Sequence, residues 1–172
     1  MHNLDNSFWT FSLAVYRQPN VAPQCLELQE KLSANVNVLL FCAWIGSEFS
    51  LLLGAGDVAA LRAANPQWHD PVVRPLRGVR SYIKTMAGED EILQALRQKV
   101  KALELQAEQI EQARLFAAKD SFVRHADTAE RAAAIRGNVA AYLGALAADS
   151  ERPTSSAPDA SHIVNAAIGL PR

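Results

Sequence analysis

The sequence predicts an all-α fold: a compact multi-helix bundle around one buried central helix, plus a long antiparallel C-terminal helical hairpin. The stretch 35–46 is apolar almost all round, which is typical of a helix covered on every side. The other predicted helices each carry one apolar stripe, and such a stripe needs a surface to pack against. Two segments in the C-terminal half repeat apolar residues at alternating spacings of three and four, which predicts the hairpin.

Length and composition indicate one domain. The chain has 172 residues, of which 49% are hydrophobic and 20% are charged, as in an ordinary globular protein. Its 17 basic and 18 acidic residues argue against a dedicated nucleic-acid-binding protein but leave room for a local basic patch. We expect a helical domain over 1–148, with its core at 5–86 and the hairpin at 88–148, followed by a disordered tail over 149–172.

The lengths of the apolar runs and the spacing of the cysteines indicate the cellular compartment of the protein. The N-terminal residues lack the basic start and apolar run of a signal peptide. The longest apolar stretches, 38–45 and 51–53, fall short of the about 20 residues of a spanning helix. Cys25 and Cys42 are predicted to be buried thiols because they do not form a Cys-x-x-Cys pair. We therefore expect a cytoplasmic protein without a membrane contact.

Three helices are predicted in the first third of the chain. Candidate caps precede a helix over 7–18, which Pro19 ends, and a second helix runs to about Leu32 from Pro23 in its first turn. The central helix follows, with Asn35 or Asn37 as its cap. We interpret both asparagines as bonding local backbone rather than a ligand.

Two further helices are predicted before the hairpin, over 57–64 and from Asp70 to about Met86. Asp70 would cap the second of these and Pro71 would be its first helical residue. Its predicted inward face consists of apolar residues at helical spacing. These are Val72, Val73, Leu76, Val79, Tyr82, Ile83 and Met86.

The hairpin prediction depends on two matching heptad seams, typical of a short coiled coil. The first seam is Leu93, Leu96, Val100, Leu103, Ala107 and Ile110. A capping box, Asp127-Thr-Ala-Glu130, starts the second helix. The second seam is Ala132, Ile135, Val139, Tyr142 and Leu146. We expect these two helices to pair, and the apolar residues from Ile163 to Leu170 to fray rather than dock.

The sequence contains no recognisable catalytic or metal-binding motif. Its histidines, at positions 2, 69, 125 and 162, form no His-x-x-x-His or Glu-x-x-His pair. The Gly54-Ala-Gly56 segment is not followed by the Gly-Lys-Ser/Thr of a phosphate loop. We predict no catalytic residue, no metal site and no cofactor.

One cluster of side chains suits an anionic ligand or partner because several guanidinium groups share a predicted helix face. The cluster is Trp68, His69, Arg74, Arg77, Arg80 and Lys84. The alternative, which we favour for these residues, is that the arginines pair with acids on the surface, for example Glu27, Glu30 or Glu48. Trp68 and Trp44 are interpreted as packing residues rather than stacking platforms.

Several stretches together resemble a proteobacterial family of conserved hypothetical proteins, classed as a domain of unknown function. The resemblance covers roughly 4–145. The residues that carry it are Phe8-Trp9, Leu13, Tyr16, Pro19, Cys25 to Gln29, Val36 to Phe41, Trp44, Trp68, Val72-Val73, Pro75 to Arg77 and Arg80. It implies a small bacterial cytoplasmic protein and transfers no catalytic residue.

Two functions follow as hypotheses. The favoured one is a non-catalytic interaction or adaptor protein, which binds a protein partner or a second copy through the hairpin and the basic face. The alternative is a small anionic-ligand-binding protein or enzyme with a pocket between the core helices. Its lining would be Asn37, Trp44, His69, Arg77 and Arg80. Nucleic-acid binding through the basic face is a third option, against which the balanced net charge argues.

Overall fold

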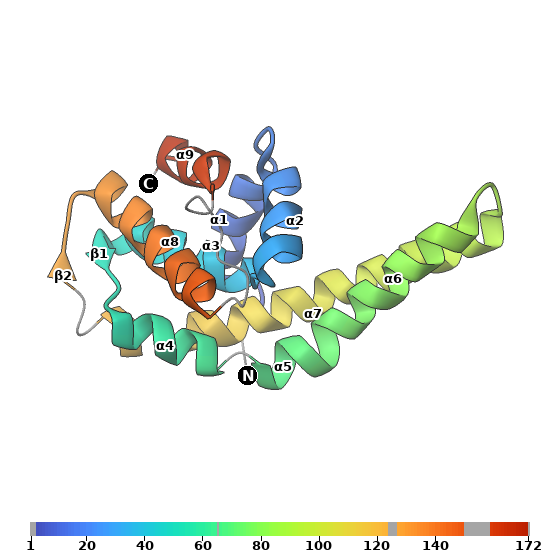
Figure 1. Cartoon of the computed structure of the whole chain (residues 1–172), viewed down its shortest axis with the longest axis horizontal. Helices are drawn as coiled ribbons and strands as arrows, with labels where there is room; N and C mark the ends of the chain where they lie inside the picture. The colour runs from blue at the N-terminus through green and yellow to red at the C-terminus, as the bar shows by residue number, and fades with distance from the viewer. Residues whose placement is uncertain (1–2, 65, 124–126, 150–158, 172) are drawn as a thin grey trace.

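The computed structural model describes residues 3–64, 66–123, 127–149 and 159–171. Within this part of the chain the structure is helical, apart from one two-residue strand pair, so the all-α prediction is confirmed (Figure 1). The elements are α1 (Ser7–Tyr16), α2 (Val21–Leu32), α3 (Val36–Phe49), β1 (Leu51–Leu52), α4 (Ala55–Ala64), α5 (Pro66–Trp68), the π-helical turn η1 (His69–Val73), α6 (Arg74–Ala87), α7 (Glu91–Val123), β2 (Asp127–Thr128), α8 (Arg131–Ala148) and α9 (Ser161–Gly169).

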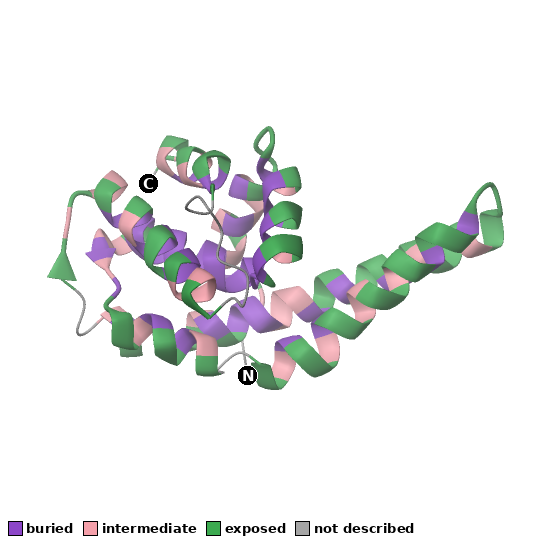
Figure 2. Ribbon diagram, in the orientation of Figure 1, coloured by how far each residue is buried: buried purple, intermediate pink, exposed green. Residues whose placement is uncertain are grey.

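Helix α3 is the centre of the bundle, as predicted. Every residue from Val36 to Ser47 is buried, and Figure 2 shows α3 almost wholly in the colour of buried residues. Asn35 caps the helix, because its Oδ1 accepts a hydrogen bond of 2.9 Å from the backbone N–H of Asn37. Asn37 is not a cap, since its own side chain bonds groups on α7.

Helix α8 packs directly on α3. A Cβ placed on Gly46 would lie 2.6 Å from the backbone nitrogen of Ile135, so only glycine permits this approach. The fully buried Asn138 of α8 donates to the carbonyls of Cys42 and Leu51, at 3.1 and 2.9 Å. Its Oδ1 accepts from the N–H of Leu53 at 2.8 Å. These bonds join α8 to the middle of α3 and to the segment of β1.

The start of α8 differs from the predicted capping box. Glu130 is the cap, and its carboxylate accepts hydrogen bonds from the N–H groups of Ala132 and Ala133. Asp127 and Thr128 are instead paired with Leu52 and Leu51 in an antiparallel two-strand ladder. The N-cap of α8 is therefore Glu130, three positions after the predicted cap Asp127.

A long antiparallel hairpin is present, but its partners differ from the predicted ones. Helix α7 packs along α6, and α8 packs on α3 (Figure 1). The buried line on α7 is Val100, Glu104, Ala107 and Glu111, whereas Leu96 and Leu103 of the predicted seam are exposed. The seam prediction was wrong because the carboxylates of α7 are buried by pairing with cationic and amide groups, which an apolar pattern does not reveal.

The hairpin of α6 and the first half of α7 projects from the remaining helices (Figure 1). We call this hairpin the arm and the remaining helices the body. Its base is a wide turn rather than a helix start at Asp70. The N–H of Arg74 bonds the carbonyl of His69, the spacing of a π-helix. Asp70 forms an ion pair of 3.3 Å with Arg74 instead of capping the helix. The prolines at positions 71 and 75 are accommodated in and just after this turn.

The predicted disordered tail contains a docked helix, so that expectation is wrong for 161–169. Ile163 and Ala167 of α9 are buried against the body, and the N–H of Ile163 donates to Gln24 at 3.0 Å. The guanidinium of Arg131 donates to the carbonyls of Ala167, Ile168 and Leu170 at the end of α9. Residues 150–158 of the predicted tail lie outside the described residues.

Among the described residues, no single helix is both long and apolar enough to cross a membrane. Helices α2 and α3 reach the required length and composition only when taken together, and they are bent by 120° where they meet.

Candidate functional site

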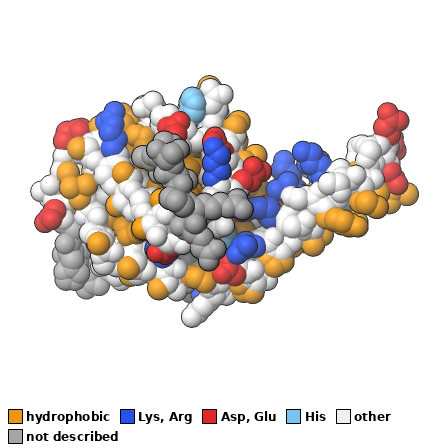
Figure 3. All heavy atoms as spheres, viewed as in Figure 1, with side chains coloured by type: hydrophobic (Ala, Val, Ile, Leu, Met, Phe, Trp, Pro, Cys, Tyr) orange, Lys and Arg blue, Asp and Glu red, His pale blue; other side chains and the backbone are white. Residues whose placement is uncertain are grey.

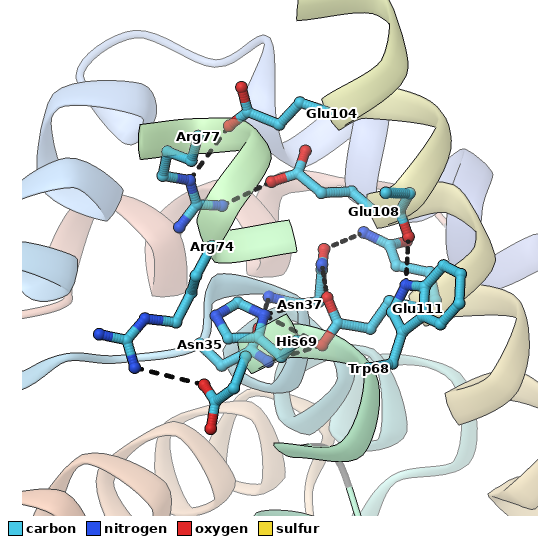
Figure 4. Close-up of polar contacts among 12 residues, drawn as sticks. Asn35, Asn37, Trp68, His69, Arg74, Arg77, Glu104, Glu108 and Glu111 are labelled. Atoms are coloured by element: carbon cyan, nitrogen blue, oxygen red, sulfur yellow. Dashed lines mark hydrogen bonds and ion pairs between the residues drawn. The ribbon is translucent and has the colours of Figure 1, made fainter. Parts of the chain in front are cut away.

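The inner face of the arm is charged. Arg77 Nε and Nη2 donate to Glu104 and Glu108, at 3.1 and 2.7 Å (Figure 4). Arg80 also donates to Glu104, through Nε and Nη2. These side chains pack between α6 and α7. The arginines do pair with acids, as the alternative interpretation held, but the acids lie on α7 and not at Glu27, Glu30 or Glu48.

One outer face of the arm is apolar, which reverses part of the predicted inward face of α6. Val79, Tyr82 and Met86 are exposed, and Figure 3 shows hydrophobic side chains along one edge of the arm. Ile92, Leu96 and Leu103 of α7 are exposed as well. The exposed fractions of these six side chains run from 46% to 81%, which is unusual for residues of their size.

At the base of the arm, a fully buried carboxylate lies at the centre of a polar cluster. Glu111 accepts hydrogen bonds from the side-chain amides of Asn35 and Asn37, at 2.7 and 2.6 Å. His69 Nδ1 lies 3.2 Å from Glu111 Oε1 (Figure 4). A buried carboxylate is tolerated only with such partners. The cluster joins η1, the N-terminus of α3 and α7.

The bonds of this cluster determine which way the neighbouring amides point. Asn37 presents its Nδ2 to Glu111, whose Oε2 accepts the hydrogen bond. Asn37 Oδ1 is therefore left to accept, and Gln112 Nε2 donates to it at 2.8 Å. Gln112 Oε1 must then face away from Asn37. It is buried, and among the described residues it has no hydrogen-bond partner.

A cavity of about 360 Å³ lies beside the cluster, between the body and the arm. It is lined by residues of α1, α2, α3, α6 and α7. Its apolar and aromatic lining is Trp9, Leu13, Tyr16, Leu26, Val36, Leu40 and Leu105. Its polar lining is Ser12, Gln29, Asn37, Arg77, Arg80, Lys101, Glu104, Glu108 and Gln112. The volume is in the range of small-molecule sites.

The charged groups of the cavity perturb one another. Burial raises the pKa of Glu108, and the carboxylates of Glu104 and Glu111 add to this effect while Arg77 opposes it. The hydrogen bond that Arg80 donates to Glu104 is the largest cause of the raised pKa of Arg80, which remains a guanidinium cation. The cavity therefore holds permanent positive charge beside one carboxyl group that protonates more readily than usual.

The structure brings together some of the predicted site residues. Asn37 and His69 meet at Glu111, and Asn37, Arg77 and Arg80 line the cavity. Trp44 is not part of this site, because it packs in the core with its ring 5.4 Å from that of Phe8.

The remaining predicted residues lie around the site. Trp68 donates to the carbonyl of Ala107 at 3.0 Å and lies under the guanidinium of Arg114. Arg74 pairs with Asp70 at the surface, and Lys84 is exposed on the arm. These three positions do not line the cavity.

Sequence reasoning missed the acidic and amide residues that complete the site. Glu104, Glu108 and Glu111 recur at spacings of four and three, so they share one face of α7. That face coincides with the buried line of the helix. The spacing was a usable signal, but a run of charged residues on a helix is usually exposed to solvent. Ser12 and Gln112 carry no comparable signal.

A family model described as "Protein of unknown function (DUF2390)" matches residues 7–115, which is more than half of the chain. The chain belongs to the DUF2390 family. The resemblance to a domain of unknown function is thus confirmed over this segment. The DUF2390 match includes every residue that lines the cavity and ends within α7, before α8 and α9.

Two further comparisons add no relative to the DUF2390 match. No curated protein and no solved structure matches the chain. In the part of the chain that the structure describes, no group of three or more His, Cys, Asp or Glu side chains could hold a metal ion.

Proposed function

We propose that this protein is an interaction protein that acts by binding and not by catalysis, and that the apolar face of the arm is its docking surface. The observation that carries the proposal is the exposure of six large apolar side chains on a projecting hairpin. These are Val79, Tyr82, Met86, Ile92, Leu96 and Leu103. Exposed apolar surface of this kind marks sites of protein association.

The occupant that we propose is a second copy of the chain, with the two arms antiparallel. The tip of the arm carries Glu89, Asp90 and Glu91, and Lys99 follows further along α7. Figure 3 shows acidic side chains at the tip of the arm and basic side chains nearer its base. Glu91 and Lys99 are eight residues apart, about 12 Å along a helix. A two-fold axis near Leu96 would set Glu91 of one copy beside Lys99 of the other. Charge complementarity then accompanies apolar contact.

The test is the molar mass in solution, measured by sedimentation as a function of protein concentration. We expect twice the chain mass of 18.7 kDa at high concentration. Ile92→Glu and Leu96→Glu should shift the protein to a monomer, because each would place a carboxylate in the apolar contact. Ser81→Glu, at an exposed polar position of the same arm, is the matched control and should leave the mass unchanged.

The orientation has its own test. Glu91→Lys and Lys99→Glu should each weaken association, and the double variant should restore it because both cross-pairs are re-formed with reversed sign. A protein that stays monomeric at every concentration overturns the proposal. So does an association that Ile92→Glu and Leu96→Glu leave unchanged.

A second candidate function, small-ligand binding, is supported by the cavity. Two of its lining residues carry a buried oxygen, Ser12 Oγ and Gln112 Oε1, that has no hydrogen-bond partner among the described residues. Buried polar atoms are nearly always paired, so unpaired ones at a cavity wall suggest that a ligand completes them. Replacing Ser12 by leucine would fill this space, and any ligand should then be lost.

A further inference from the structure

We infer that the cavity binds a small organic anion, a carboxylate or a phosphate monoester, with an apolar or aromatic body and an O–H or N–H donor at its far end. The inference rests on the ligand-binding candidate above and assigns the chemistry of the ligand. It follows from the polarity of the two ends of the cavity.

The end of the cavity in the body demands a hydrogen-bond donor. Gln112 is 3% exposed, and its Oε1 is fixed as the free acceptor because Nε2 is held by Asn37, which is held in turn by Glu111. An amide flip of Gln112 would set its Oε1 against Asn37 Oδ1. Both atoms are acceptors, so only the unflipped orientation forms this hydrogen bond. Ser12 Oγ, also 3% exposed, adds a hydroxyl that can donate or accept. A ligand that reaches this end needs an O–H or N–H group for the amide oxygen.

The end of the cavity in the arm favours an anion. Three cations, Arg77, Arg80 and Lys101, face two carboxylates there, so one positive charge is in excess. Both arginines use Nε and Nη2 for Glu104 and Glu108, which leaves each Nη1 without a bond among the described residues. Lys101 is exposed and has no ion pair in the described chain. These donors suit a carboxylate or phosphate oxygen.

The helix that forms the floor sets the length of the ligand. Gln112 and Glu104 are eight residues apart on α7, which corresponds to about 12 Å. Between them the wall is apolar and aromatic, with Trp9 and Leu13 on α1 and Leu40 on α3. A ligand with a single ring and a short acidic chain spans this distance.

The test uses 3-(4-hydroxyphenyl)propionate as the carboxylate probe and 2-(4-hydroxyphenyl)ethyl phosphate as the phosphate probe, so that the two sources of the anion are distinguished. Binding is read from the indole N–H signals of the tryptophans in nitrogen-15 NMR spectra. Trp9 lines the cavity, whereas Trp44 and Trp68 do not. We expect the Trp9 signal, assigned with Trp9→Phe, to shift on titration while the other two stay in place.

Matched probes test each end of the ligand. The methyl ether of the phenol lacks the donor, and 4-(3-hydroxypropyl)phenol lacks the charge. Each loss should weaken binding at least about tenfold, the usual effect of one hydrogen bond to a charged or buried group. Tyramine, which carries an ammonium in place of the anion, should bind more weakly than either anion. Tighter binding of tyramine would overturn the assignment of an anion while the cavity remained a binding site.

Variants of the protein separate the two ends. Lys101→Glu should weaken the anionic probes, and Lys84→Glu, a charge reversal on the arm at a residue that does not line the cavity, should not. Ser12→Ala should weaken binding without loss of stability, because the hydroxyl has no hydrogen-bond partner in the part of the chain that the structure describes. If no probe of either charge shifts Trp9, the ligand-binding candidate itself fails. Equal binding to wild type and Lys101→Glu would contradict the inferred position of the anion.

Discussion

Asn37 Nδ2 lies 2.6 Å from Glu111 Oε2, and this bond joins the central helix to the helix that forms the arm. We predict that Glu111→Ala lowers the free energy of unfolding by about 3 kcal/mol or more, because the amides of Asn35 and Asn37 lose their buried acceptor. Urea denaturation measures the change. Gln106→Ala, at an exposed position of α7, should cost less than about 0.5 kcal/mol. Equal effects of the two variants would mean that the buried hydrogen bonds of Glu111 make no net contribution to the free energy of unfolding.

The contact between α3 and α8 is tested by two glycines. Gly46→Ala should destabilise the protein by about 2 kcal/mol or more, since the added methyl meets the backbone of Ile135. Gly144→Ala is the matched control, because nothing lies within 4 Å of a Cβ at this position in the middle of α8. It should be neutral or stabilise by up to about 1 kcal/mol through helix propensity. Thermal unfolding of both variants measures the difference. If Gly46→Ala unfolds at the same temperature as the wild type, the close approach of α3 and α8 at Gly46 is contradicted.

Docking of α9 is predicted to depend on Arg131. Its guanidinium bonds Ser47 Oγ at 2.8 Å as well as three carbonyls at the end of α9. Arg131→Met keeps the length of the side chain but removes these donors. Hydrogen exchange followed by mass spectrometry should then show faster exchange over 161–169, with little change elsewhere. Arg136→Met, at an exposed position of α8, should leave the exchange of α9 as in the wild type.

The two cysteines are predicted to be unreactive in the folded protein. Burial is the main cause that raises the pKa of both thiols, Cys25 and Cys42, to about 12. A raised pKa means less thiolate, so at about pH 8 only about one thiol in ten thousand is ionised. Alkylation with iodoacetamide, followed by intact mass, should be complete in urea and nearly absent in buffer. Rapid modification of the native protein would contradict the burial of these side chains.

Stability should respond to pH through Glu108. Its pKa is raised above the ordinary value of 4.5 when the chain is folded, so it contributes stability below that value and loses this contribution as pH rises through the folded pKa. Glu108→Gln has no such titration. Its stability relative to the wild type should therefore improve between about pH 4 and pH 7. Denaturation at several pH values measures the difference, and a constant difference would contradict the raised pKa.

The sequence was sufficient for the parts of the fold that depend on apolar pattern. Stretch 35–46 identified the central helix because a helix without a polar face must be covered on all sides. The partner of α7 could not be predicted from its seam, because Glu104 and Glu111 occupy buried positions. Glu104 is stabilised there by an ion pair, and Glu111 by hydrogen bonds from side-chain amides. The docking of α9 was missed for a related reason, since Arg131 holds it from a distant part of the chain.

The candidate site was predictable on its basic side and at Asn37. Arg77 and Arg80 stood out as a cluster on one helix, and the structure places both at the cavity. Ser12 and Gln112 have ordinary side chains in ordinary helical contexts, and only the geometry shows that Ser12 Oγ and Gln112 Oε1 lack hydrogen-bond partners among the described residues. Trp44 does not line the cavity, because its ring packs in the core against Phe8, Phe41 and Phe116, as the packing interpretation held.

The π-helical turn at His69–Val73 sets the rotational phase of everything after it. Such a turn holds one residue more than a turn of α-helix, and one residue corresponds to about 100° of rotation. Every side chain of α6 therefore points about 100° away from the direction that an uninterrupted helix would give it. His69 can reach Glu111 on one side of the turn while Arg77 reaches Glu104 on the other. The number of residues in this turn therefore determines on which side of the arm the exposed apolar residues of α6 lie.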